Sequence, residues 1–258
     1  MNALLAQLSP EVGAVGRNAE RAARTVVEHP DADLAVFPEL YLSGYSVRGL
    51  EQVSREADAD ELRLVQAAAA ATRTAVIIGF AERWEDGFGN SAACIDEAGR
   101  LVAIYRKTLL FGVEADAFTA GEELVVVSLA GRKIAPLICF DIEFPEPARR
   151  VAQAGAELLT TISANFDPFA LDHAIPTLSR AMENRLPHLY CNMVGSSDGF
   201  EFVGGSRSMS PLGEVLYEAP ANLEDVAIVP VADRTGVDER ADYLPLLREM
   251  PAVSDKSR

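Results

Sequence analysis

Short apolar runs that alternate with helix-forming segments restrict the fold of this 258-residue chain more than any other feature of its sequence. The runs "ADLAVFPE" (32–39) and "KIAPLICFD" (133–141) are almost unbroken, as expected of strands covered on both faces. Helices are predicted over 18–29, 58–73, 147–154 and 170–186. The alternation predicts an α/β domain with helices outside layered sheets.

Further strands are predicted at 2–8, 74–84, 91–95, 101–107, 123–129, 157–163, 188–195, 206–217 and 225–231. The segments "DGFGN" and "DEAGR" on either side of 91–95 are turn signals, as is "SPLG" within 206–217. Length alone would allow two domains, but no linker, repeat or low-complexity run divides the chain. A single domain over 1–258 is therefore predicted.

Composition limits the partners and the compartment of the protein. Cys94, Cys139 and Cys191 are widely separated, without the spacing of a disulfide framework or a zinc site, which favours a reducing, cytoplasmic compartment. The first residues lack the features of a secretory signal, and no apolar stretch is long enough to span a bilayer. A formal charge of −16 disfavours nucleic acid and anionic membrane surfaces as partners.

Three residues at the ends of predicted strands are candidates for chemistry. Burial at the end of "LAVFPE" would raise the pKa of Glu39 and suit it to act as a base, although pairing with an arginine is an open alternative. Lys107 follows "LVAIYR" and could stabilise an oxyanion, or be an ordinary surface lysine. Cys139 ends an apolar run just before the acidic turn "DIEFPE". It is either an inert core thiol or a nucleophile whose thiolate is stabilised by helix amides and a nearby cation.

The order of the three segments favours the chemical interpretation. "FPELYLSGY", "YRKTLLFG" and "LICFDIEFPE" closely resemble the Glu, Lys and Cys segments of the nitrilase superfamily, the carbon–nitrogen hydrolases. The resemblance extends from about residue 3 to about residue 231 and leaves a short polar tail. It implies a four-layer α-β-β-α sandwich, homodimers or larger homo-oligomers, and no cofactor.

The resemblance also implies the roles of individual residues. Cys139 would be the nucleophile, Glu39 the base, and Lys107 the stabiliser of the tetrahedral intermediate. Glu114 matches a second glutamate of the family, although Asp116, Glu122 and Glu123 lie close by. The backbone N–H of Phe140 would help to hold the oxyanion. Asn165 and Phe166 occupy a segment that commonly borders the substrate pocket, with ordinary loop structure as the alternative.

The activity implied is hydrolysis of a small carboxylic amide to acid and ammonia, because "CFDIEFPE" resembles the cysteine segment of the amidase branches. A nitrilase, an N-carbamoyl hydrolase or an idle member that acts as a binding subunit are the alternatives. Leu109 is a departure, since many members carry histidine there. His173 could line the site, with a surface or core-satisfied imidazole as the alternative, and Arg48 could pair with a substrate carboxylate or be a solvated arginine.

Overall fold

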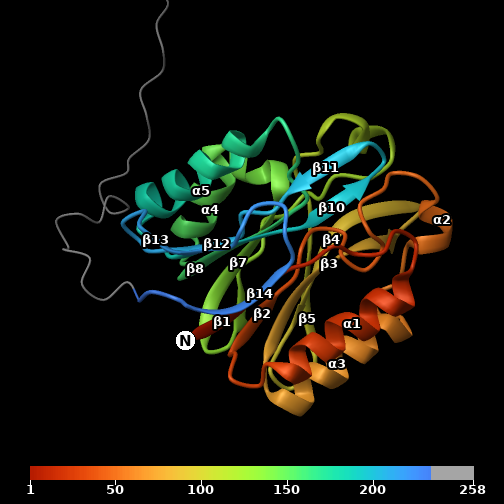
Figure 1. Cartoon of the computed structure of the whole chain (residues 1–258), viewed down its shortest axis with the longest axis horizontal. Coiled ribbons are helices and arrows are strands. Elements are labelled where there is room, and N and C mark those ends of the chain that lie inside the picture. The colour runs from red at the N-terminus through yellow and green to blue at the C-terminus, as the bar shows by residue number, and fades with distance from the viewer. Residues whose placement is uncertain (234–258) are drawn as a thin grey trace, which may run out of the picture.

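The computed structural model describes residues 1–233, in which two sheets lie face to face between layers of helices (Figure 1). The first sheet has six strands in the order β14-β1-β2-β3-β4-β5. Its bounds are β1 (Asn2–Gln7), β2 (Leu34–Val36), β3 (Ala75–Trp84), β4 (Gly87–Ile95), β5 (Leu101–Arg106) and β14 (Asp225–Pro230).

The second sheet also has six strands, in the order β13-β12-β9-β8-β7-β6. Its bounds are β6 (Val127–Leu129), β7 (Arg132–Ile138), β8 (Leu158–Ser163), β9 (His188–Asn192), β12 (Arg207–Met209) and β13 (Val215–Glu218). A separate hairpin joins β10 (Val194–Ser197) to β11 (Phe200–Val203). In each sheet the central strands are parallel, so their carboxyl ends lie at one edge, where α/β proteins place their ligands.

The helices cover the outer faces of the two sheets. α1 (Val15–Glu28) and α3 (Asp60–Thr72) lie side by side over the first sheet, and α4 (Pro145–Gln153) and α5 (Ala170–Asn184) over the second (Figure 1). A short helix α2 (Leu50–Val53) and the 3-10 helices η1 (Gly112–Asp116) and η2 (Cys139–Glu143) belong to the connections. No helix in residues 1–233 is long and apolar enough to cross a membrane.

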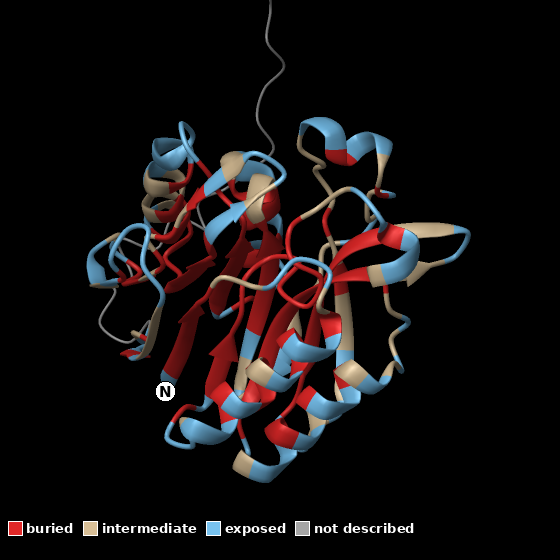
Figure 2. Ribbon diagram, turned by 45° about the vertical axis from the view of Figure 1, so that its right-hand side comes forward, coloured by how far each residue is buried: buried red, intermediate tan, exposed pale blue. Residues whose placement is uncertain are grey.

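The side-chain alternation of β1 explains the layering. Ala3 and Leu5 pack into the core between the sheets, whereas Leu4 and Ala6 pack against the layer of α1 and α3. Both faces of the strand are therefore buried, which requires the continuous apolar run seen in the sequence. Figure 2 shows buried residues concentrated on the strands and exposed residues on the outer sides of the helices.

The predicted α/β sandwich is confirmed, with local differences. The strand predicted over 133–141 ends at Ile138, because the carboxylate of Asp141 accepts a hydrogen bond of 3.0 Å from the Ile138 N–H and closes a turn. Residues 87–90 of "DGFGN" belong to β4, and the turn lies at residues 85–86. Only residues 127–129 of the predicted strand 123–129 pair in the sheet, and 188–195 is divided between β9 and β10. Most of the predicted tail, residues 234–258, lies outside the described residues.

Candidate active site

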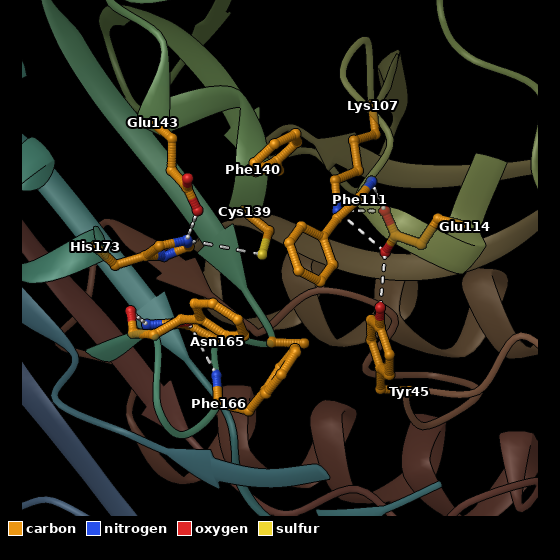
Figure 3. Close-up of a pocket in the computed structure, with 12 residues that line it drawn as sticks. Tyr45, Lys107, Phe111, Glu114, Cys139, Phe140, Glu143, Asn165, Phe166 and His173 are labelled. Carbon is orange, nitrogen blue, oxygen red and sulfur yellow. Dashed lines mark hydrogen bonds and ion pairs between the residues drawn. The ribbon is translucent and has the colours of Figure 1, made fainter. Parts of the chain in front are cut away.

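The side chains of Glu39, Lys107, Glu114 and Cys139 meet at the carboxyl-end edge of the two sheets. Glu39 follows β2, Lys107 follows β5, Cys139 follows β7, and Glu114 lies in η1. In Figure 3, Lys107 and Glu114 lie on one side of Cys139. Segments separated by up to 100 residues thus form one site, as the family resemblance implied.

Lys107 is the centre of a buried charge network. Its Nζ donates hydrogen bonds of 2.7 Å to Oε1 of Glu39 and 2.8 Å to Oε2 of Glu114, and all three side chains have no exposed surface. Asn90 donates to the same Glu39 oxygen at 2.7 Å, and the Tyr45 hydroxyl donates to Glu114 at 3.0 Å. The alternatives of a surface lysine and of a Glu39 paired with an arginine are therefore wrong.

The electrostatics of the network distinguish its acid from its cation. Burial raises the pKa of Glu39, Lys107 opposes this shift, and the negative charge of Glu114 adds to it. Burial alone would lower the pKa of Lys107, but the two carboxylates raise it well above its ordinary value. Lys107 therefore keeps its charge, and Glu39 is the member whose raised pKa suits it to exchange a proton. Oε2 of Glu39 is buried and has no hydrogen-bond partner among the described residues.

Cys139 lies on a sharp bend between β7 and η2. Its φ is +46°, in the left-handed region that a non-glycine residue occupies only when the surroundings hold it there. Asp141 provides much of that support, because its carboxylate accepts hydrogen bonds from the Leu109 N–H at 3.0 Å and the Tyr105 hydroxyl at 2.7 Å, besides that from Ile138. The acidic turn that follows Cys139 therefore shapes the bend.

The expectation of a stabilised thiolate is wrong for the resting site. Burial raises the pKa of the Cys139 thiol, and the charge of Glu39 raises it further, while Lys107 offsets this only in part. The cation is already neutralised by two carboxylates, so it has little attraction left for a thiolate. The thiol is therefore protonated at rest and needs a base to become a nucleophile.

Cys139 opens onto a small pocket with about 310 Å³ of empty space, counted out to its mouth. The wall is mainly aromatic, and the rings of Phe111 and Phe140 lie 5.2 Å apart, edge to face. The lining residues are Tyr45, Lys107, Phe111, Glu114, Cys139, Phe140, Glu143, Ala164, Asn165, Phe166, Phe169 and His173. The pocket is small, so it limits the size of a molecule that can reach the sulfur.

The two predicted pocket residues differ in how they contribute. Phe140 lines the pocket and directly follows Cys139 in the chain. Asn165 also lines it, but its side-chain amide is engaged with its own loop, donating to the Phe169 carbonyl at 3.1 Å and accepting from the Phe166 N–H at 3.0 Å. Asn165 therefore shapes the wall, and Phe166 lies beside it in the lining.

His173 lies closer to the sulfur than the sequence indicated. Its Nε2 is 4.0 Å from Sγ of Cys139 and 3.4 Å from Oε1 of Glu143, and its Nδ1 contacts the hydroxyls of Tyr190 at 2.9 Å and Ser163 at 3.2 Å. Burial lowers the pKa of His173, although Glu143 opposes the shift. The imidazole is therefore neutral at neutral pH.

Several site residues were missed in the sequence. Tyr45, Phe111 and Glu143 lie inside the quoted motif segments, so proximity to the motifs was an available signal, whereas Asn90 was hidden in a segment assigned to a turn. Phe169 lies in the same loop as Asn165 and Phe166, so its place in that loop was the available signal. Arg48 is exposed and is not among the pocket-lining residues, and the side chain of Leu109 lines a different hollow, beside Phe144 and Glu146.

The other two cysteines are core residues. Cys94 and Cys191 are completely buried, and burial raises the pKa of each to about 12. All three cysteines are free. Within residues 1–233 no group of three or more His, Cys, Asp or Glu side chains is arranged to hold a metal ion.

Comparison with known proteins gives consistent matches. Residues 4–238 match the family model described as carbon-nitrogen hydrolase. A protein of Pseudomonas protegens named "Hydrolase in pqqF 5'region" is 38% identical over 91% of this chain and 83% of its own length. An (R)-stereoselective amidase of Pseudomonas sp. is 37% identical over 83% of this chain and 79% of its own length.

A solved structure gives a close match to the fold. It is an amidase of the nitrilase superfamily from Nesterenkonia AN1, with a TM-score of 0.86 and 28% identity over 96% of this chain and 94% of that one. Another structure of that amidase, with a TM-score of 0.85, 28% identity and the same coverage, shows covalent addition of the acetamide moiety of fluoroacetamide at the active-site cysteine.

Proposed function

Because the chain belongs to the carbon–nitrogen hydrolase family, we propose that it hydrolyses small carboxylic amides to the acid and ammonia through a thioester on Cys139. The observation that carries this proposal is the position of the thiol. Cys139 lies on a bend at the floor of a small pocket, beside a buried base and a buried cation. The amidase relatives and the adduct on the cysteine of the Nesterenkonia enzyme support it.

In the first half of the reaction, Glu39 takes the thiol proton and the sulfur attacks the amide carbonyl. Glu39 suits the role of base because its pKa is raised and its Oε2 has no hydrogen-bond partner among the described residues. The tetrahedral oxyanion is stabilised by the Lys107 ammonium and the Phe140 N–H. Glu39 then gives its proton to the nitrogen, the C–N bond breaks, ammonia leaves, and a thioester remains.

In the second half, the same carboxylate removes a proton from water, which attacks the thioester. A second tetrahedral intermediate collapses with cleavage of the C–S bond, and the thiolate recovers its proton from Glu39. The sum is amide plus water to acid plus ammonia. Glu114 holds Lys107 in place throughout the reaction. Its carboxylate accepts a hydrogen bond from the Lys107 ammonium and another from the Tyr45 hydroxyl.

The same family membership leads us to propose a homodimer or larger homo-oligomer without a cofactor. Light scattering of the purified chain tests the oligomeric state. A monomer at micromolar concentration would contradict the proposed oligomer. We also propose a cytoplasmic location, because three free cysteines suit a reducing compartment.

The test of the proposed function is ammonia release from a panel of small amides, nitriles and carbamoyl compounds, with wild type and Cys139→Ala in parallel. Release from amides by wild type alone is expected. Turnover of nitriles alone would identify a nitrilase. Release of carbon dioxide together with ammonia would identify a carbamoyl hydrolase. No turnover, with a thiol unreactive toward iodoacetamide, would favour an idle binding subunit.

A further inference from the structure

Among the described residues that line the pocket, Glu143 is the one charged group that lies outside the Lys107 network and is open to solvent in part. Its side chain is 28% exposed, whereas those of Lys107, Glu39 and Glu114 are fully buried. The mechanism above does not use it. Its backbone carbonyl accepts a hydrogen bond of 2.9 Å from Arg180, which fixes the position of the main chain and leaves the carboxylate free to face the pocket.

Within residues 1–233, the carboxylate of Glu143 has no full countercharge. Its described partner is Nε2 of His173, at 3.4 Å, and that imidazole is neutral at neutral pH because burial disfavours its charged form. A neutral imidazole can donate one hydrogen bond but does not cancel the charge. The remaining oxygen capacity of Glu143 is available to a ligand.

The rest of the pocket wall also favours a cation over an anion. Four phenylalanine rings line it, from Phe111, Phe140, Phe166 and Phe169, and aromatic faces attract ammonium groups. Among the described lining residues, Lys107 is the one cationic side chain, and its ammonium is already bound by two carboxylates. A substrate carboxylate would therefore meet Glu143 without a free cation to offset the repulsion.

Glu143 and the Lys107 network lie on opposite sides of Cys139. Figure 3 shows Glu143 and His173 on one side of Cys139, with Lys107 and Glu114 on the other. Nε2 of His173 lies 4.0 Å from the sulfur and 3.4 Å from Oε1 of Glu143, so a chain of a few bonds from the carbonyl carbon reaches the carboxylate. The overall charge of −16 would further favour the approach of cationic molecules.

We propose that this pocket selects small amides that carry an ammonium group a few bonds from the carbonyl carbon, with Glu143 as the residue that binds the ammonium. This inference rests on the proposed amidase function and specifies its substrate class. It disfavours amides of dicarboxylic acids and N-carbamoyl amino acids, since both carry an anionic group.

Three amides of similar size test the proposal: 3-aminopropanamide, butyramide and succinamate, which are cationic, neutral and anionic at pH 7.5. The readout is kcat/KM for ammonia release. Wild type is expected to prefer 3-aminopropanamide to butyramide by about tenfold or more, the size of one charge-assisted contact, and to turn over succinamate most slowly. A preference for butyramide or succinamate would overturn the inference while leaving the amidase function intact.

Glu143→Gln is expected to reduce the preference for the cationic amide to within about twofold of unity. The ratio of the two kcat/KM values is the measure, because a general loss of activity cancels in it. Glu143→Asp keeps the charge and should keep a preference, which separates charge from packing. Glu146→Gln is the matched control, because Glu146 is an exposed acid three residues away that lies outside this pocket.

A preference that persists in Glu143→Gln would show that another group binds the ammonium and would overturn the proposal. If Glu143→Gln does not fold, the ratio of the two kcat/KM values in wild type and in Glu143→Asp still tests the proposal. Absence of ammonia from all three amides would instead overturn the proposed function, and the inference with it.

Discussion

Glu39 and Lys107 form an ion pair of 2.7 Å between two side chains with no exposed surface. Burying both charges is costly, so the arrangement persists only because Glu114, Asn90 and Tyr45 supply further hydrogen bonds. A buried ion pair whose desolvation costs free energy, placed at the carboxyl-end edge of the sheets, is a feature of a functional site. The arrangement also explains why Lys107 lowers the pKa of the neighbouring thiol too little to offset burial, and why the reaction needs Glu39 as a base.

Replacement of Glu39 tests that role directly. Glu39→Gln keeps the shape but cannot accept the thiol proton, so kcat/KM for a responsive amide is expected to fall by roughly 10²–10⁴. In wild type the carboxylate is required and burial raises its pKa, so activity should fall as pH drops through a value above the ordinary 4.5 for glutamate. A pH profile of kcat/KM measures this, and the acid limb should disappear in the variant. A variant with near wild-type activity would show that Glu39 is misassigned.

Replacement of Lys107 should affect stability as well as activity. Lys107→Met leaves two buried carboxylates without their cation, a change that typically costs about 3–5 kcal/mol of unfolding free energy. Urea unfolding at pH 7.5 measures the loss, and ammonia release should fall by about a hundredfold or more. Lys133→Met is the control, because that lysine is exposed on β7 and its loss should change stability by about 0.5 kcal/mol or less. Equal effects of the two substitutions would contradict the network.

His188 should make stability depend on pH away from the active site. Its ring is completely buried and contacts the Thr161 hydroxyl at 2.9 Å and the Thr177 carbonyl at 3.0 Å, and burial lowers its pKa from 6.5 to about 4. The unfolded state therefore binds more protons between pH 6.5 and 4. The contribution of His188 is complete above 6.5 and is lost as pH falls toward 4, by on the order of 3 kcal/mol.

Urea unfolding at pH 7.5 and 5.0 checks this expectation. Wild type should lose stability between the two conditions, and His188→Gln should lose less, although it starts from a lower value. His173, whose pKa burial also lowers, contributes to the same window in both proteins and so cancels in the comparison. An identical loss in the variant would mean that His188 does not titrate as inferred.

Much of the site could be predicted because its residues follow strands that the sequence pattern indicates. Glu39, Lys107 and Cys139 each follow an apolar run, and one edge of an α/β sheet collects such ends. The tertiary contacts could not be predicted: nothing in the sequence shows that two carboxylates hold one lysine, or that Asn90 faces Glu39 from a strand whose first residues look like a turn. The expected direction of the Cys139 pKa shift was wrong for that reason, because the shift depends first on how deeply the sulfur is buried and then on how fully Lys107 is neutralised.

Gly79 in β3 supplies a last prediction, on how the base is positioned. A Cβ on this residue would lie 2.4 Å from both the Leu40 nitrogen and the Pro38 oxygen, so the segment that carries Glu39 rests directly on the strand backbone. Gly79→Ala must push that segment outward. We expect a loss of kcat/KM of about tenfold or more, together with about 1–3 kcal/mol of unfolding free energy. Gly16→Ala, in open space on α1, is the control and should be neutral or slightly stabilising. Wild-type activity in Gly79→Ala would show that the position of Glu39 tolerates displacement, and with it that the geometry of the buried pair does not limit the rate.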